Sequence, residues 1–311
     1  MGRVESLADR ALTSALDAKP SVGPGGPVRV PLDARRWHFQ HGPIDLIVAA
    51  DGSEAVSAAA RERGWRRFET VLEELVAELP LLRGPVERAT GLRGTVARRM
   101  LAACWPHRSR FITPMAAVAG AVADEVLAAM TDGAAGVPKA YVNNGGDIAL
   151  HLGPGEAFRI GVVAGDVTRH GHRVPLDGRF EVTGAMPVRG VATSGWRGRS
   201  WSLGIADSVT VLAADGATAD AAATMIANAV DVDSPAIERR RACEVDDNTD
   251  LGERLVTIAV GPLPEDAVEE ALARGAARAQ GLADTALIWG AVLALGSRSR
   301  VVGGVAALEH R

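Results

Sequence analysis

Three polar segments hold the residues of this chain that are best suited to chemistry. The first is Asn143-Asn144-Gly145-Gly146-Asp147, which stands between two apolar runs. Adjacent glycines permit positive backbone φ angles and let a ligand approach the main chain closely. The asparagines and the aspartate add hydrogen-bond donors and acceptors at a strand end. The same residues are also ordinary hairpin-turn chemistry, so a binding site and a plain turn both stay open.

The second segment, residues 192–200, follows another apolar run and combines hydroxyls, glycines and two arginines. Thr193, Ser194, Gly195 and Arg197 are the ingredients of an anion cradle made of backbone amides and a guanidinium group. The segment is not a P-loop, because the lysine and the glycine spacing of that motif are absent. An exposed basic loop is the alternative interpretation.

The third segment contains Asp220 and Thr224, which are four residues apart. On a helix they share one face, and both offer oxygen atoms to a hard cation such as Mg²⁺. Asp207 or a main-chain carbonyl near Ala192 would complete such a metal shell. The alternative is that Asp220 is a helix-start residue whose carboxylate accepts hydrogen bonds from free amides of its own first turn.

Taken in order, these segments resemble the ApbE-like superfamily, the FAD:protein FMN transferases and their relatives. The matching motifs are Asn143–Ile148, Ala192–Gly195, the strand Ser208–Val211, and the pairs Ala219-Asp220 and Ala223-Thr224. The resemblance implies that Asp220 and Thr224 bind Mg²⁺. It also implies that the glycine-rich turn contacts flavin and that the Ser194-Gly195 loop lines an FAD site. The chain resembles most the short cytoplasmic members of uncharacterised function.

Two positions depart from the pattern of the transferases. Their His-x-x-Asp-Pro-x-Thr/Ser-Gly run is replaced here by residues 202–207, and a lysine-glycine pair by Ala119-Gly120. We therefore expect an enzyme with a pocket for FAD, FMN or another anionic metabolite, whose reaction is unknown and whose FMN transfer is weak or absent. The alternatives are a Mg²⁺-dependent FMN transferase with a divergent signature and a non-catalytic flavin- or ligand-binding protein.

Composition narrows the class of protein further. The chain has 311 residues, a formal net charge of −4 and two cysteines. It lacks the basic excess of a dedicated nucleic-acid binder, and two cysteines are too few for a disulfide framework. Charged residues interrupt the first 27 residues, and Asp124 and Glu125 end the most apolar run, 114–123, so we expect no signal peptide and no membrane partner. The predicted location is the cytoplasm; the oligomeric state is open, a homodimer included.

Apolar patterns and chain breakers predict the elements that position the three segments. Strands are expected at 28–31, 37–40, 44–49, 140–142, 148–152, 158–163, 180–182, 188–193, 208–213, 255–260 and 286–295. Helices are expected at 54–79, 96–103, from 114 onward, and at 218–230, 235–241 and 265–280. Clustered strands with helices between them predict an α+β fold, with layered antiparallel sheets and packed helices, as the ApbE-like (T-fold-like) resemblance also implies. We expect a flexible lead over 1–27 and a single domain over 28–305.

Overall fold

The computed structural model describes residues 25–133, 136–162 and 178–305. Helices combine with antiparallel sheets, which confirms the predicted α+β class. The first 24 residues of the expected lead, and the last residue of the strand expected at 158–163, lie outside the described residues. The single-domain boundary at residue 28 therefore stays a prediction.

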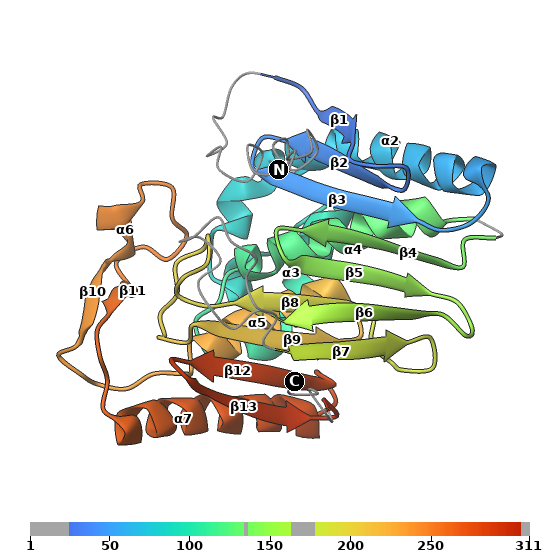
Figure 1. Ribbon diagram of the computed structural model, residues 1–311. Helices are drawn as coiled ribbons and strands as arrows, with labels where there is room; N and C mark the ends of the chain where they lie inside the picture. Colours follow the sequence, from blue (N-terminus) through green and yellow to red (C-terminus); the bar gives the residue numbers. More distant parts are fainter. Residues whose placement is uncertain (1–24, 134–135, 163–177, 306–311) are drawn as a thin grey trace, which may run out of the picture.

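A nine-stranded sheet forms the centre of the molecule, with strand order β1-β2-β3-β4-β5-β8-β9-β12-β13 (Figure 1). Every neighbouring pair in it is antiparallel. Its strands are β1 (Val28–Pro31), β2 (Arg36–His41), β3 (Ile44–Ala50), β4 (Lys139–Asn144), β5 (Asp147–Leu152), β8 (Gly190–Ser194), β9 (Ser208–Ala213), β12 (Gly290–Leu295) and β13 (Arg298–Gly303). Two hairpins stand apart from it, β6 (Ala157–Val162) with β7 (Gly178–Thr183) and β10 (Ile237–Arg241) with β11 (Leu255–Val260).

The helices gather on one face of the large sheet (Figure 1). The main ones are α2 (Glu54–Leu82), α3 (Thr95–Cys104), α4 (Val118–Thr131), α5 (Gly216–Ala227) and α7 (Glu265–Asp284), and α6 (Ala242–Val245) is a single turn in the β10–β11 arm. Side chains alternate across each strand, so β9 turns Val209 and Val211 toward the helices and Leu212 toward the other face. There the β6–β7 hairpin covers a smaller apolar cluster.

Helices α4 and α5 touch backbone to backbone at their first turns. A Cβ atom on Gly120 would lie 2.2 Å from the carbonyl oxygen of Gly216, so only glycine fits there. Asp124 of α4 then accepts hydrogen bonds from the amides of Gly216 at 2.8 Å and Ala217 at 2.9 Å. These amides are unpaired donors of the α5 N-terminus, and the Asp124 carboxylate satisfies them from the neighbouring helix.

Three sequence predictions need correction. The helix expected at 235–241 is wrong, because Ile237–Arg241 is strand β10, paired with β11. The helix expected to end at residue 79 continues through Pro80 to Leu82, since a proline in the last helical turn removes only one hydrogen bond. The strand expected at 286–295 starts later, at Gly290, and is followed by the unforeseen β13 after a turn in which Gly296 has a φ of 60°.

The segment Pro114–Thr131 is long and apolar enough to cross a membrane by length and composition alone. It begins as a 3₁₀ turn at Pro114–Ala117 and continues as α4, where the sequence predicts a helix from Pro114. In the structure 56% of it is buried inside the fold. Its neighbours are α2, α3, α5 and the sheet, so it packs inside the fold.

The contact between Gly120 and Gly216 yields a stability prediction. We expect Gly120→Ala to lower the free energy of unfolding by about 3 kcal/mol, because the new methyl group would displace the Gly216 backbone. The control is Gly281→Ala in α7, where nothing lies within 4 Å of the new Cβ. That variant should gain up to about 1 kcal/mol from better helix propensity. Urea unfolding checks both, and equal stabilities would contradict the close-contact interpretation.

Candidate functional site

The predicted glycine-rich segment is the hairpin turn between β4 and β5. Asn143 closes it by accepting a hydrogen bond from the amide of Gly146 at 2.8 Å. Gly145 and Gly146 have φ angles of 65° and 116°, which a side chain would strain. Asn144 is buried and donates to the carbonyl of Ala119, at the start of α4, at 3.1 Å. The turn is thereby anchored to the helix layer.

Asp147 joins this turn to the second predicted segment. Its Oδ1 accepts a hydrogen bond from the backbone amide of Thr193 at 3.2 Å. The hydroxyl of Thr193 lies 2.9 Å from that of Thr210 on β9. The two segments meet because β5 and β8 are neighbours in the sheet, with Ile148 opposite Val191. Strands far apart in sequence thus bring the two polar runs side by side.

Arg199 brings a positive charge to the same place. Its Nη1 lies 3.7 Å from where a Cβ of Gly145 would stand, so the guanidinium group is next to the glycine-rich turn. Asp45 of β3 is held by His38 at 2.8 Å. That hydrogen bond and then the nearby charges of His38 and Arg199 keep the pKa of Asp45 below its usual value, although burial opposes them. Arg199 was part of the predicted loop, but its place over the turn is a tertiary feature.

Asp220 does not cap its own helix. That role belongs to Asp215, whose carboxylate accepts from the amide of Thr218 at 2.7 Å. The Oδ2 of Asp220 instead accepts from the amide of Gly120, in the first turn of α4, at 3.0 Å. The helix-start alternative for Asp220 is therefore wrong in its original form. Because Asp124 of α4 binds the first amides of α5, the two helices cap each other reciprocally.

This arrangement concentrates acidic groups in a half-buried place. Burial raises the pKa of Asp147 to about 7, against the opposing effect of the Thr193 amide. Burial and the charge of Asp147 raise the pKa of Asp220 well above its usual value. Burial likewise raises the pKa of Asp124 to about 6. Carboxylates with such perturbed pKa values are typical of functional sites, although structural networks produce them too.

The carboxylate and hydroxyl oxygens gathered here suit a hard cation. Two carboxylates that repel each other are stabilised when a proton or a cation lies between them, and Mg²⁺ prefers oxygen ligands. Thr224 is half-buried on α5, and its hydroxyl makes no hydrogen bond within the described part of the chain. In those same residues, no group of three or more His, Cys, Asp or Glu side chains is placed to hold a metal. A cation here would therefore depend on few protein ligands, with a ligand phosphate or water completing the shell.

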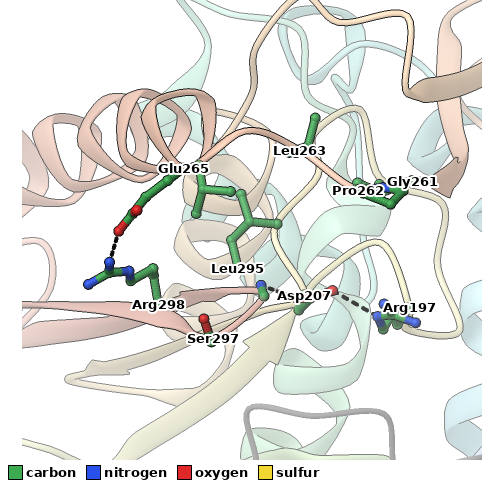
Figure 2. Close-up of a pocket in the computed structure, with 12 residues that line it drawn as sticks. Arg197, Asp207, Gly261, Pro262, Leu263, Glu265, Leu295, Ser297 and Arg298 are labelled. Carbon is green, nitrogen blue, oxygen red and sulfur yellow. Dashed lines mark hydrogen bonds and ion pairs between the residues drawn. The ribbon is translucent and has the colours of Figure 1, made fainter.

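Arg197 and Asp207 belong to a different feature, a cavity of about 490 Å³ at the end of β12 (Figure 2). The loop Val260–Glu265 and the β12–β13 turn line its remaining walls. Asp207 accepts from Trp196 at 3.1 Å and from Arg197 at 2.7 Å through Oδ1, and from the Gly296 amide at 2.7 Å through Oδ2. Its carboxylate therefore braces the loop against the turn, rather than completing a metal shell at Asp220.

The remaining predicted residues lie between these two features. Ser194 ends β8 opposite Val209, and Gly195 follows it directly. A Cβ on Gly195 would lie 2.3 Å from the carbonyl oxygen of Asp207, so the loop can pass there only with glycine.

Sequence reasoning missed Asp124. Its signal was an acidic residue on the otherwise apolar face of a predicted helix, where a buried carboxylate needs hydrogen-bond donors.

Comparisons with known proteins place these segments in a wider group. A family model described as "AbpE bacteria" matches residues 29–303. A UPF0280 protein of Methanopyrus kandleri is 40% identical over 221 residues, which are 69% of this chain and 83% of the relative. A UPF0280 protein of Methanospirillum hungatei is 33% identical, covering 63% and 76%. The apo crystal structure of the flavinyl transferase ApbE of Pseudomonas stutzeri aligns over 90% of this chain and 96% of its own, at 14% identity and a TM-score of 0.38.

The raised pKa of Asp147 predicts a pH-dependent stability. The folded state binds this proton more tightly than the unfolded chain, so stability is present at pH 4 and is lost as the pH rises toward 7. We expect Asp147→Asn, which keeps the acceptor for Thr193, to exceed the wild type by about 1 to 2 kcal/mol at pH 8 and to match it at pH 4. Asp247→Asn, at an exposed loop position, is the control. A variant less stable than the wild type at pH 8 would contradict the prediction.

Proposed function

Because the chain belongs to the family described as "AbpE bacteria", as its motifs predicted, we propose that it binds a phosphate-bearing metabolite, a flavin nucleotide such as FAD or FMN in the first place. The proposed site comprises the β4–β5 turn, the loop that follows β8 and the face of α5 that carries Asp220 and Thr224. We further propose that the protein acts in the cytoplasm and is an enzyme, whose reaction the site does not specify.

The observation that carries this proposal is the meeting of Asp147 and Asp220. A carboxylate pair with raised pKa values weakens the folded protein at neutral pH, unless a bound cation or proton offsets the repulsion. Natural proteins keep such costly arrangements mainly where they serve function. Arg199, which lies next to the glycine-rich turn, supplies a positive charge close to these carboxylates. Cation and anion sites side by side suit a ligand that carries both phosphate and Mg²⁺.

The chain's own residues divide the work of binding in this proposal. Asp220, Thr224 and Asp147 hold Mg²⁺ through oxygen atoms. The guanidinium group of Arg199 and the backbone amide of Gly145, which unlike that of Gly146 is not bonded to Asn143, hold the anionic part of the ligand. When bound, Mg²⁺ supplies neutralisation of phosphate charge. The Thr193 amide fixes Asp147 in place, and the Gly120 amide does the same for Asp220.

The segment that replaces the transferase signature supports a reaction other than FMN transfer. Ile205 and Ala206 are fully buried in the core beneath the sheet. Ser202 is buried and lies 3.2 Å from the side-chain oxygen of Asn228, which also accepts from the amide of Leu203 at 2.9 Å. None of these side chains can accept a proton as a histidine would, and Asp207, the last residue of the segment, is already bound by Trp196, Arg197 and the Gly296 amide. Residues 202–206 therefore brace the loop rather than offer groups for catalysis.

The metal role is tested by Asp220→Asn. The asparagine oxygen still accepts from the Gly120 amide, so the fold should persist while the charge is lost. We expect wild-type affinity for FAD to rise at least about tenfold when Mg²⁺ is added, and the variant to show no such rise. Calorimetric titration with and without Mg²⁺ checks this, with Asp247→Asn as the control. Equal affinities for FAD in all four titrations would contradict the metal role of Asp220. If the wild type bound no FAD, with or without Mg²⁺, the flavin proposal would be wrong.

The missing signature predicts weak or no FMN transfer. The purified protein is incubated with FAD, Mg²⁺ and an acceptor protein that carries the transferases' target threonine motif. We expect less than about one per cent of the acceptor to gain covalent flavin, because the absence of a positioned proton-transfer group costs typically 10² to 10⁴ in rate. Mass spectrometry of the acceptor measures the product. Robust flavinylation would instead favour the alternative of a transferase with a divergent signature.

A further inference from the structure

The cavity at the end of β12 has no part in the proposed function. Its volume of about 490 Å³ is within the range of pockets that hold small molecules (Figure 2). It lies between the loop that leads from β11 into α7 and the β12–β13 turn. Pro262 and Pro264 stand in that loop, and proline fixes the backbone φ angle. This wall of the cavity is therefore stiff and largely preformed.

One side of the cavity is apolar. The half-buried side chains of Val260, Leu263 and Val268 line it, together with buried Leu295 of β12. In Figure 2, Leu263 and Leu295 lie between the two charged ends of the cavity. Contact with an apolar ligand surface would remove these side chains and the ligand from water together, which is favourable. The wall therefore favours a ligand with an apolar surface of its own.

The charged groups at the two ends are already paired. At one end Arg197 donates from Nε to Oδ1 of Asp207 at 2.7 Å. At the other end Arg298 forms an ion pair with Glu265. The two positive and two negative side chains that line the cavity balance, and a charged ligand would have to displace one member of a pair. The cavity therefore suits an uncharged ligand.

Arg197 gives the cavity a planar group at one end. Its guanidinium group lies over the ring of Trp196, with Cζ 4.5 Å from the ring centroid. Trp196 is not among the residues that line the cavity, so it supports Arg197 from the side away from the cavity. A guanidinium plane stacks on aromatic rings, and the attraction is larger where water is excluded. The side of Arg197 that lines the cavity therefore suits an aromatic ring.

We propose that this cavity is a binding site for an uncharged aromatic heterocycle. The ring stacks on Arg197 and packs its edge against Leu263, and the hydroxyl of Ser297 at the rim bonds a ring nitrogen or oxygen. The proposal does not rest on the flavin or Mg²⁺ proposal, because neither Asp147 nor Asp220 lines the cavity.

The test is a titration of the full chain with adenosine and with indole, followed by saturation-transfer NMR. Both probes are aromatic, uncharged at physiological pH and free of phosphate, and cyclohexanol is the non-aromatic reference. We expect both aromatic probes to bind saturably below about 10 mM. Cyclohexanol should bind at least about fivefold more weakly, because it cannot stack on Arg197.

Two variants with matched controls test where the ring binds. Leu263→Trp places a large side chain in the cavity and should weaken adenosine binding at least about tenfold. Leu255→Trp, at an exposed position of β11, should bind adenosine as the wild type does. Arg197→Met keeps an unbranched side chain without the planar cation and should weaken binding about fivefold. Its control is Arg240→Met, which removes an exposed ion pair with Glu238 and should have no effect.

Asp220→Asn separates this site from the proposed flavin site. It should bind adenosine as the wild type does, and a loss of binding in this variant would place the ring near Asp220 and overturn the proposal. Unchanged affinity in Leu263→Trp would overturn it too. The same holds for equal affinities of adenosine and cyclohexanol, and for the absence of saturable binding of both aromatic probes. Failure of FAD to bind would leave these outcomes unchanged.

Discussion

The first turns of α4 and α5 exchange carboxylates, and the geometry of the candidate site depends on that exchange. Asp124 accepts hydrogen bonds from the amides of Gly216 and Ala217, and Asp220 accepts one from the amide of Gly120. The exchange requires the helices to touch, which only glycine at their crossing permits. It places Asp220 near Asp147, the first residue of β5. The same contact that joins two core helices thus also sets the charge of the site.

The negative charge of these carboxylates affects the stability of the fold as well as its capacity to bind a cation. Asp124, Asp147 and Asp220 all have raised pKa values, and burial is the first cause in each case. Each therefore favours the folded protein less at neutral pH than in mild acid. A cation between Asp147 and Asp220 would remove much of this penalty.

The loop between β8 and β9 makes two separate sets of contacts. Arg199 extends toward the β4–β5 turn, next to Gly145. Arg197 turns the other way, to Asp207 and the cavity at the β12–β13 turn. The loop can make both contacts because Gly195 lets its backbone pass against the carbonyl of Asp207. Its buried part, with Ile205 and Ala206, holds this shape from below.

The sequence by itself determined the elements and the family. The pattern of apolar residues and the positions of chain-breaking residues predicted almost every strand of the large sheet, because local patterns of burial repeat along each strand. The ordered motifs identified the family that the comparisons confirm. Only the tertiary structure decided what Asp220 binds, since its partner at Gly120 is a hundred residues away. It also turned 235–241 from helix to strand through pairing with β11, and it separated Asp207 from the acidic pair. Long-range hydrogen bonds of this kind leave no periodic trace in a single chain.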